Sequence, residues 1–417
     1  MQTIIRLKRI AGVMIAIICT GFILYRCMDR ENKKLTSEQV PNEKMRVAYD
    51  EYAGSATCNS CHSDIYEKHL QTAHHRTSML PDEKNILGSF QSGRNKYVYT
   101  PALYITMNRT DTGLYQSVFY QGERKRDFKF DIVTGSGTKG QTFLYWEGNK
   151  LFQMPISYFT APAQWAVSPG FPADKVLFDK PITTRCLECH TTFAERTSAP
   201  DIKHEEYNRN KFILGIECEK CHGPSAGHVA FHSGKDTSKK DVINPASFTR
   251  QQQLDMCVLC HGGNMKKTQP SFSYIAGETL ADYFTMDTVS VDAVNTGNVD
   301  VHGNQFGLLR ASACFRQSKT MTCLTCHSPH ERERDNTVLF STRCMNCHQK
   351  EHGNFCTIKP MPAGIEKNCI DCHMPKMPSM AVTLYTEGAA VPTPAMIRSH
   401  FISIYHDETK KFLPLLK

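Results

Sequence analysis

The distribution of apolar residues divides the 417-residue chain into zones of different character. Near the start, an uncharged apolar run from Ile10 to Tyr25 follows Arg6, Lys8 and Arg9. The run is a little shorter than the roughly 20 residues that cross a bilayer core, and longer than many signal-peptide cores. We therefore expect residues 1–29 to form an uncleaved signal anchor with its N-terminus in the cytoplasm.

Two alternatives for this segment stay open. Cleavage near Cys19-Thr-Gly21 would release the body, although these residues match a small-x-small cleavage site poorly. A lipoprotein anchored at Cys27 is disfavoured by Tyr25 and Arg26, because large and charged residues stand where small residues belong.

Two short zones separate this segment from the rest of the chain. Residues 30–52 are rich in charged side chains, including Glu31 and Lys33, and predict a solvated linker. In residues 53–87, apolar side chains recur at helical spacing and predict a helix. The positions that carry this spacing are Ile65, Tyr66, His69, Leu70 and Ala73.

The next zone, residues 88–180, has a residue pattern typical of β-strands. Aromatic and β-branched residues alternate with polar ones in Tyr97–Tyr99, Leu103–Met107 and Phe128–Ile132. Turn signals such as Arg109-Thr-Asp-Thr-Gly113 separate these runs. The pattern predicts an inserted antiparallel β subdomain.

One glycine-rich stretch in this zone, Gly135-Ser-Gly-Thr-Lys-Gly140, matches the dinucleotide fingerprint GxGxxG. The fingerprint requires a helix after it, so that the helix N-terminus faces the pyrophosphate. The residues that follow, Gln141 to Trp146, have the composition of a strand. We therefore expect a turn between two strands here, and no nucleotide as a ligand.

Residues 181–417 show weak apolar periodicity, with frequent Gly, Pro and polar residues, and predict short helices joined by irregular loops. This zone contains most copies of one pentapeptide, Cys-x-x-Cys-His, which occurs seven times in the chain. We number the copies as motifs 1 to 7: Cys58-Asn-Ser-Cys61-His62, Cys186-Leu-Glu-Cys189-His190, Cys218-Glu-Lys-Cys221-His222, Cys257-Val-Leu-Cys260-His261, Cys323-Leu-Thr-Cys326-His327, Cys344-Met-Asn-Cys347-His348 and Cys369-Ile-Asp-Cys372-His373.

This pentapeptide is the attachment site of c-type haem. Two thiols on one tight turn can each add to a vinyl group of the same porphyrin, and the adjacent His can then bind the iron as proximal ligand. Zinc sites also use Cys-x-x-Cys pairs, but they do not need a His after every second Cys. The sequence therefore predicts seven covalently attached haems c, held by all fourteen motif cysteines and ligated by the seven motif histidines.

The composition fits this interpretation. Hydrophobic residues make up only 40% of the chain, so we expect the porphyrins to build part of the core. Of the net charge of +8, half comes from residues 1–40, and haem propionates add negative charge to the body. The basic balance therefore gives no reason to expect nucleic acid as a partner.

Haem attachment outside the cytoplasmic membrane places the body in the periplasm. Four of the 18 cysteines lie outside the motifs: Cys19, Cys27, Cys314 and Cys356. Because Cys314 and Cys356 flank motifs 5 and 6 in an oxidising compartment, we expect a disulfide between them, with two free thiols as the alternative.

The haem segments resemble multihaem cytochromes of the cytochrome c554/c552 family. The resemblance rests on residues 54–62 with Tyr66 and Thr72-Ala-His74, on Gly215–His228, and on the segments Cys323–His330 and Cys369–Pro375. It covers the haem zones well and the β subdomain more loosely, and it departs at His69, where the family often has Trp. It implies a mainly α and irregular multihaem cytochrome c fold with a haem-built core, to which the β subdomain is added.

The resemblance also implies mostly bis-His haems, in which a second imidazole fills the distal position of the iron. Its best distal candidates are His74, His228, His302, His330, His352 and His400. These are six candidates for seven motifs, so His75 or His69 would supply the last ligand, or one iron would be open or carry Met. We expect His204, His232 and His406 to be exposed.

Three functions follow from this reading. The first is a membrane-anchored, periplasm-facing carrier that transfers electrons between respiratory proteins or from a membrane quinol-linked complex. The second is an oxidoreductase that acts on a small nitrogen or sulfur compound at one open haem, since nitrite, hydroxylamine and tetrathionate enzymes share such haem arrangements. In the third, the β subdomain docks the chain to a larger respiratory complex. Whether the chain is an enzyme stays open, and the carrier is favoured.

Overall fold

A computed structural model describes residues 46–198, 205–238, 241–286, 300, 302–359 and 361–416. The described residues of 46–197 and from 205 onward belong to one unit. The expected signal anchor, most of the linker and His204 lie outside the described residues. Within these ranges, no helix is long and apolar enough to cross a membrane.

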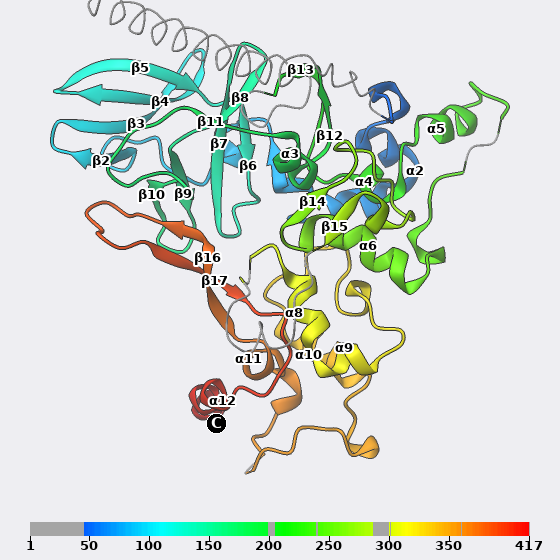
Figure 1. Cartoon of the computed structure of the whole chain (residues 1–417). Helices are drawn as coiled ribbons and strands as arrows, with labels where there is room; N and C mark the ends of the chain where they lie inside the picture. Colours follow the sequence, from blue (N-terminus) through cyan, green and yellow to red (C-terminus); the bar gives the residue numbers. More distant parts are fainter. Residues whose placement is uncertain are drawn as a thin grey trace, which may run out of the picture. The chain divides into compact units, whose positions relative to one another are not determined.

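Two antiparallel sheets form the β-rich part of the chain (Figure 1). The four-stranded sheet consists of β2 (Lys96–Thr100), β3 (Leu103–Thr110), β4 (Gly113–Tyr120) and β5 (Glu123–Lys129). The seven-stranded sheet consists of β1 (Ser78–Met79), β6 (Ile132–Thr134), β7 (Gly140–Glu147), β8 (Lys150–Gln153), β9 (Ile156–Phe159), β10 (Gln164–Val167) and β11 (Lys180–Pro181).

The glycine-rich fingerprint lies between β6 and β7, which pair antiparallel. It is a turn between two strands, as the sequence predicts. A side chain at Gly135 would lie 2.7 Å from the Gly140 carbonyl oxygen, and the φ of Gly135 is +101°. The glycines therefore serve a tight backbone turn.

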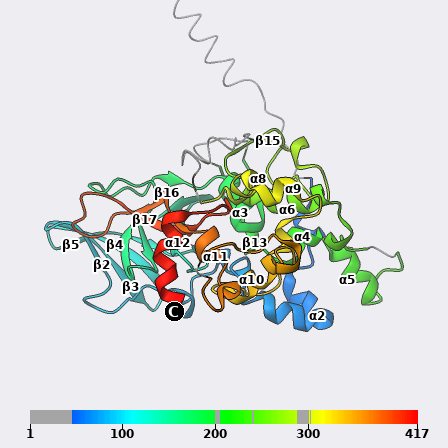
Figure 2. The same cartoon turned by 90° about the horizontal axis from the view of Figure 1, so that it is seen from below.

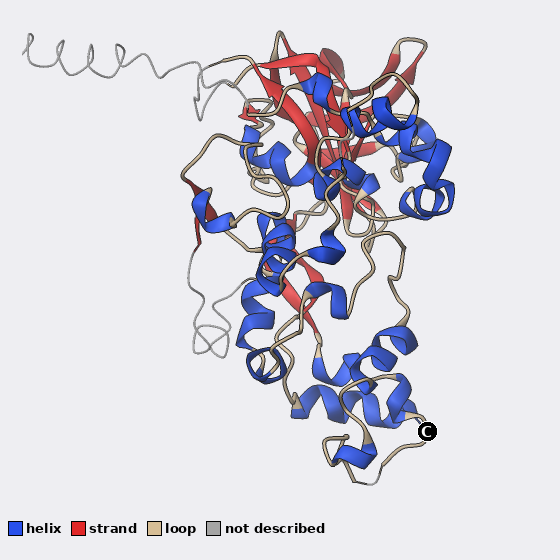
Figure 3. Ribbon diagram, turned by 90° about the vertical axis from the view of Figure 1, so that its right-hand side faces the viewer, coloured by secondary structure: helices blue, strands red, loops and turns tan. Residues whose placement is uncertain are grey.

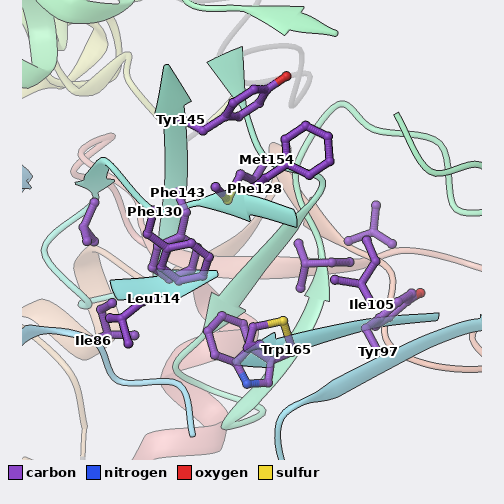
Figure 4. Close-up of a cluster of buried hydrophobic side chains, with 14 of the residues drawn as sticks. Ile86, Tyr97, Ile105, Leu114, Phe128, Phe130, Phe143, Tyr145, Met154 and Trp165 are labelled. Atoms are coloured by element: carbon purple, nitrogen blue, oxygen red, sulfur yellow. The ribbon is translucent and has the colours of Figure 1, made fainter. Parts of the chain in front are cut away.

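Side chains from both sheets share one buried core. Successive residues of a strand point to opposite faces, so Val133, Phe143 and Phe152 enter this core while their neighbours face away from it. Figure 4 shows Phe130 and Phe143 in this cluster, where the ring centres lie 4.3 Å apart. The amide nitrogen of the buried Gln116 donates to the Ile156 carbonyl at 2.7 Å, which ties the two sheets together.

The other face of the seven-stranded sheet carries the neighbours Ile132, Leu144 and Leu151, which belong to a second core. This core also contains Leu187 of α3 (Thr184–His190) and Tyr207 of the hairpin formed by β12 (Thr191–Arg196) and β13 (Tyr207–Leu214). Because α3 contains motif 2, the β-rich part directly positions one of the motifs.

In the view of Figure 3, some helices lie beside the sheets in the upper half and the others lie below them. The described helices are α2 (Ser55–His69), α3, α4 (Cys218–His222), α5 (Ala226–His232), α6 (Arg250–His261), α8 (Gln305–Ala311), α9 (Ala313–Gln317), α10 (Thr337–Met345), α11 (Ile370–His373) and α12 (His406–Phe412). Short 3₁₀ turns connect them, including η1 (Tyr49–Glu51), η2 (His75–Thr77), η6 (Cys323–Thr325) and η7 (Lys350–His352).

The zone after residue 181 also contains strands, which the sequence analysis did not expect there. Besides β12–β13, it holds the pairs β14 (Met265–Lys267) with β15 (Phe284–Met286), and β16 (Lys376–Leu384) with β17 (Thr393–Arg398) (Figure 2). Leu384 packs against Phe159 and Ala166 of the β-rich part, whereas Met377 packs against α8. These hairpins form because their apolar residues pack against apolar surfaces from other parts of the chain. Such tertiary packing cannot be predicted from the local periodicity of the sequence.

Residues 46–52, assigned to the linker from sequence, pack against the body. The Val47 side chain is buried, and the Arg46 guanidinium pairs with the Glu278 carboxylate at 2.6 Å. The described end of the linker is therefore held to the helical part.

Candidate functional site

Each Cys-x-x-Cys-His motif lies on a helical turn. Motif 1 lies inside α2, and motifs 2, 3, 4 and 7 end at the last residue of α3, α4, α6 and α11. Motif 5 begins with η6, and motif 6 begins near the end of α10. In motifs 5, 6 and 7, the amide of the His donates to the carbonyl of the first Cys at 3.0 to 3.1 Å.

This conformation explains the spacing. Residues three and four positions apart share one face of a helical turn, so both thiols and the imidazole of a motif lie on the same side of the backbone. One flat macrocycle beside that face can therefore meet two sulfur atoms and one nitrogen ligand. The donor set and its arrangement on these turns fit c-type haem.

Three motif histidines face a histidine from elsewhere in the chain. The ring centres of His261 and His74 are 6.3 Å apart, those of His222 and His330 are 6.1 Å apart, and those of His327 and His400 are 6.1 Å apart. With a metal–nitrogen bond of about 2 Å and roughly 1 Å from a ring nitrogen to the ring centre, two imidazoles on one metal have centres about 6 Å apart. The three separations therefore match axial pairs on one iron.

The Nδ1 atoms of several motif histidines form hydrogen bonds with other parts of the protein. His222, His348 and His373 donate from Nδ1 to the backbone carbonyls of Ile243, Asn354 and Ser403, at 2.9, 2.9 and 2.8 Å. A carbonyl only accepts, so the proton of each ring lies on Nδ1 and the lone pair lies on Nε2. Two more Nδ1 atoms have polar partners: that of His190 is 3.2 Å from Thr77 Oγ1, and that of His261 is 3.2 Å from Gln305 Oε1.

Metal-binding histidines usually donate their second ring N–H to such an acceptor, which fixes the ring orientation. The acceptors lie far from the motifs in sequence, and no local signal identifies them. They are the supporting residues that the sequence analysis missed.

Burial keeps some of these imidazoles neutral. It lowers the pKa of His400 to about 4, and it also lowers the pKa of His190 and of His330 below the ordinary value. A neutral imidazole has the lone pair that iron requires. His74, His261 and His327 keep accessible surface, which a macrocycle between facing rings would cover.

Among the described residues, no motif histidine ring faces the other predicted distal histidines. His302 lies within electrostatic reach of His190 and His261. Because His261 already faces His74, we expect His302 to pair with His190. His228 lies on α5, where its ring centre is 4.5 Å from that of His232, and its buried Nδ1 has no hydrogen-bond partner. His352 is exposed in η7, and His232 and His406 are exposed as expected.

His69 and His75, the two reserve ligands, converge on a carboxylate. His75 Nδ1 lies 2.6 Å from Glu217 Oε1, and His69 Nε2 lies 3.6 Å from Glu217 Oε2. Among the described residues, neither ring pairs with a motif histidine. In the structure these two imidazoles therefore form a separate cluster.

The motifs contact one another in an order that differs from the sequence. The thiol of Cys58 interacts with that of Cys218, joining motifs 1 and 3. Similar contacts join Cys189 to Cys260, Cys257 to Cys323, and Cys344 to Cys369. Two further pairs of motifs interact only electrostatically. Cys221 of motif 3 interacts in this way with Cys257 of motif 4, and Cys326 of motif 5 with Cys344 of motif 6.

The expected Cys314–Cys356 disulfide is not formed. Both thiols are free. Cys314 lies near Cys344 and Cys347 of motif 6, whereas Cys356 lies near Cys372 of motif 7. The two thiols thus accompany different motifs, which sequence spacing alone did not indicate.

Comparison with known proteins bears on this arrangement. The family model for cytochrome c554 and c-prime matches residues 173–223, which contain motifs 2 and 3. The crystal structure of the outer cell wall cytochrome OcwA matches with a TM-score of 0.52 and 18% sequence identity, over 87% of this chain and 81% of that one. The chain has a multihaem cytochrome fold. No curated protein matches it. The two matches together support a multihaem c-type cytochrome with haem c as cofactor and electron transfer as its role.

Proposed function

We propose that the chain is a membrane-anchored, periplasm-facing c-type cytochrome that carries seven haems and transfers electrons between respiratory partners. The observation that carries the proposal is the set of three facing imidazole pairs, His261 with His74, His222 with His330, and His327 with His400. When both axial positions of a haem are filled by imidazole, the iron has no position left for a substrate, so the haem passes electrons only.

The proximity of the motifs supports the same function. Electron transfer over many steps needs redox centres that are near neighbours. Motif cysteines contact one another in four motif pairs (1 with 3, 2 with 4, 4 with 5, and 6 with 7), and electrostatic interactions join motif 3 to motif 4 and motif 5 to motif 6. The chain's contribution is to hold the rings in place, through the carbonyl acceptors at Nδ1, and to set the environment of each centre by burial. The anchor in residues 1–29 and the respiratory partners belong to the proposal.

The alternative is an oxidoreductase that acts on a small nitrogen or sulfur compound at one open haem. One observation favours it: among the described residues, no second imidazole ring faces His62, His348 or His373. If one of these motifs lacks a distal histidine, its iron would be open to a substrate.

Ligand binding and spin state separate the two functions. Reduced carrier should bind little carbon monoxide, and its spectrum should be almost wholly low-spin. The single variants His74→Ala, His330→Ala and His400→Ala should each convert one haem to high spin and open one carbon monoxide site, with all thioethers intact. His232→Ala, an exposed histidine, is the control and should change neither signal.

One result would count against the carrier, and another would count against the assigned distal ligands. If the unmodified protein binds one equivalent of carbon monoxide or nitrite and has a matching high-spin signal, the oxidoreductase is favoured. If the three alanine variants stay low-spin, the assignment of distal ligands from ring geometry is wrong.

A further inference from the structure

Three side chains outside the Cys-x-x-Cys-His motifs converge between motifs 1 and 3. His69 is the last residue of α2, His75 is the first residue of η2, and Glu217 immediately precedes α4. The exposed fraction is 8% for the His69 and Glu217 side chains and 34% for the His75 side chain. One ligand atom from each of the three lies within 4.8 Å of the others.

The charge of this cluster leaves a place for a cation. Glu217 is a buried carboxylate: His75 Nδ1 lies 2.6 Å from its Oε1, and its buried Oε2 has no hydrogen-bond partner among the described residues. Within the described part of the chain, the ion-pair partners of Glu217 are the two histidines. Neutral imidazoles would leave this buried negative charge without compensation, which is costly.

The distances suit a metal ion of the first transition row. Ligands about 2.0 to 2.2 Å from a tetrahedral zinc ion lie roughly 3.3 Å from one another. The observed separations, 2.6 Å for His75 Nδ1 to Glu217 Oε1 and 3.6 Å for His69 Nε2 to Glu217 Oε2, bracket that value. His69 Nε2 donates to the Ile216 carbonyl at 3.1 Å. A bound metal ion would take the place of this proton, the ring proton would then lie on Nδ1, and the carbonyl oxygen would be free to serve as a fourth ligand.

The backbone around the cluster is held in place by two neighbours. Thr72 Oγ1 donates to the His69 carbonyl at 2.7 Å and accepts from the His75 amide at 3.1 Å, which fixes the relation of the two histidines. A side chain at Gly215 would lie 2.5 Å from the His75 carbonyl oxygen and 2.7 Å from Glu217 Oε1, and its φ of +75° also favours glycine. The cluster is therefore pre-organised.

We propose that His69, His75 and Glu217 form a binding site for a divalent first-row transition-metal ion. Two imidazoles and one carboxylate are a ligand set for zinc and for non-haem ferrous iron. The site goes beyond the proposed electron transfer and does not depend on it. A bound ion would join the segment after motif 1 to the start of motif 3, and its charge would raise the reduction potential of the nearest haems.

Zinc binding to the complete haem-loaded protein tests the proposal. After chelator treatment and removal of the chelator, zinc is titrated and the bound metal is counted by elemental analysis. Unmodified protein should bind one zinc ion more tightly, by at least tenfold, than either Glu217→Gln or His75→Gln. His232→Gln is the matched control and should bind like unmodified protein. Calcium, which prefers oxygen-only sites, should not compete.

The haem spectrum provides an independent check on each variant. It should stay low-spin and unchanged, which shows that the variant has folded and that neither imidazole is an iron ligand. The proposal is overturned if unmodified protein binds no more zinc than Glu217→Gln and His75→Gln. It is also overturned if His69→Gln or His75→Gln produces a high-spin haem. If Glu217→Gln does not fold, His75→Gln gives the comparison, because His75 is the more exposed ligand.

Discussion

A single carboxylate within motif 3 holds the start of α2, and its contribution to stability can be tested. Glu219 is 3% exposed, and its Oε1 accepts from the Ala53 and Ser225 amides, both at 2.8 Å. Its Oε2 accepts from the Gly54 amide at 2.9 Å. Three backbone donors, from the approach to motif 1 and from the start of α5, thus meet one buried anion.

Glu219→Gln keeps the shape of the side chain but removes the charge and turns one oxygen into an NH₂ group. One N–H donor then faces another donor, and the remaining hydrogen bonds lose their charge. A hydrogen bond to a charged group contributes about 1.5 to 3 kcal/mol, so we expect the free energy of unfolding to fall by about 3 kcal/mol.

Guanidinium unfolding of the haem-loaded protein, followed by far-ultraviolet circular dichroism, measures this loss. Glu67→Gln, on an exposed position of α2, is the control and should change the free energy of unfolding by less than about 0.5 kcal/mol. The reasoning is refuted if the two variants unfold at the same denaturant concentration.

Three further predictions follow from the sequence and the structure. The Arg343 guanidinium holds the pKa of Glu333 below its ordinary value. The stabilisation by this pair is therefore present above about pH 4.3 and is lost as the pH falls through the lowered pKa. Because Glu333→Gln removes this pair, the variant should lose stability less steeply in acid. Intact-mass spectrometry after acid denaturation should find seven haem increments, and five or fewer in mature protein would contradict the motif count. N-terminal sequencing of protein extracted from membranes should find residues before Tyr25, whereas a soluble protein that begins near Cys27 would show that the signal is cleaved.

The sequence predicts those features that depend on interactions between residues close together in the chain. The alternation around Tyr97 and Leu103 corresponds to strands, and the glycine-rich stretch after Thr134 is a turn. The Cys-x-x-Cys-His spacing predicts haem attachment because the chemistry depends on neighbouring residues in one turn. These signals need no information about distant parts of the chain.

The relations between distant residues could not be obtained in this way. The pairing of His327 with His400, and the contact of the Cys58 and Cys218 thiols, join residues separated by long stretches of chain. The same holds for Glu217, which had no distinguishing pattern in sequence and becomes notable only because His69 and His75 fold against it. Tertiary packing decides these contacts, so a single sequence does not specify them.

The order of contacts among the motifs makes the molecule a branched network and not a simple row. Motif 4 contacts motif 2 through Cys260, and motif 5 through Cys257, which also lies near Cys221 of motif 3. Among the cysteine contacts of the described residues, motif 4 therefore joins motifs 1, 2 and 3 to motifs 5, 6 and 7. If the proposed haems follow these contacts, loss of the haem at motif 4 would interrupt electron transfer between the two groups, whereas loss of the haem at motif 2 would remove one end point.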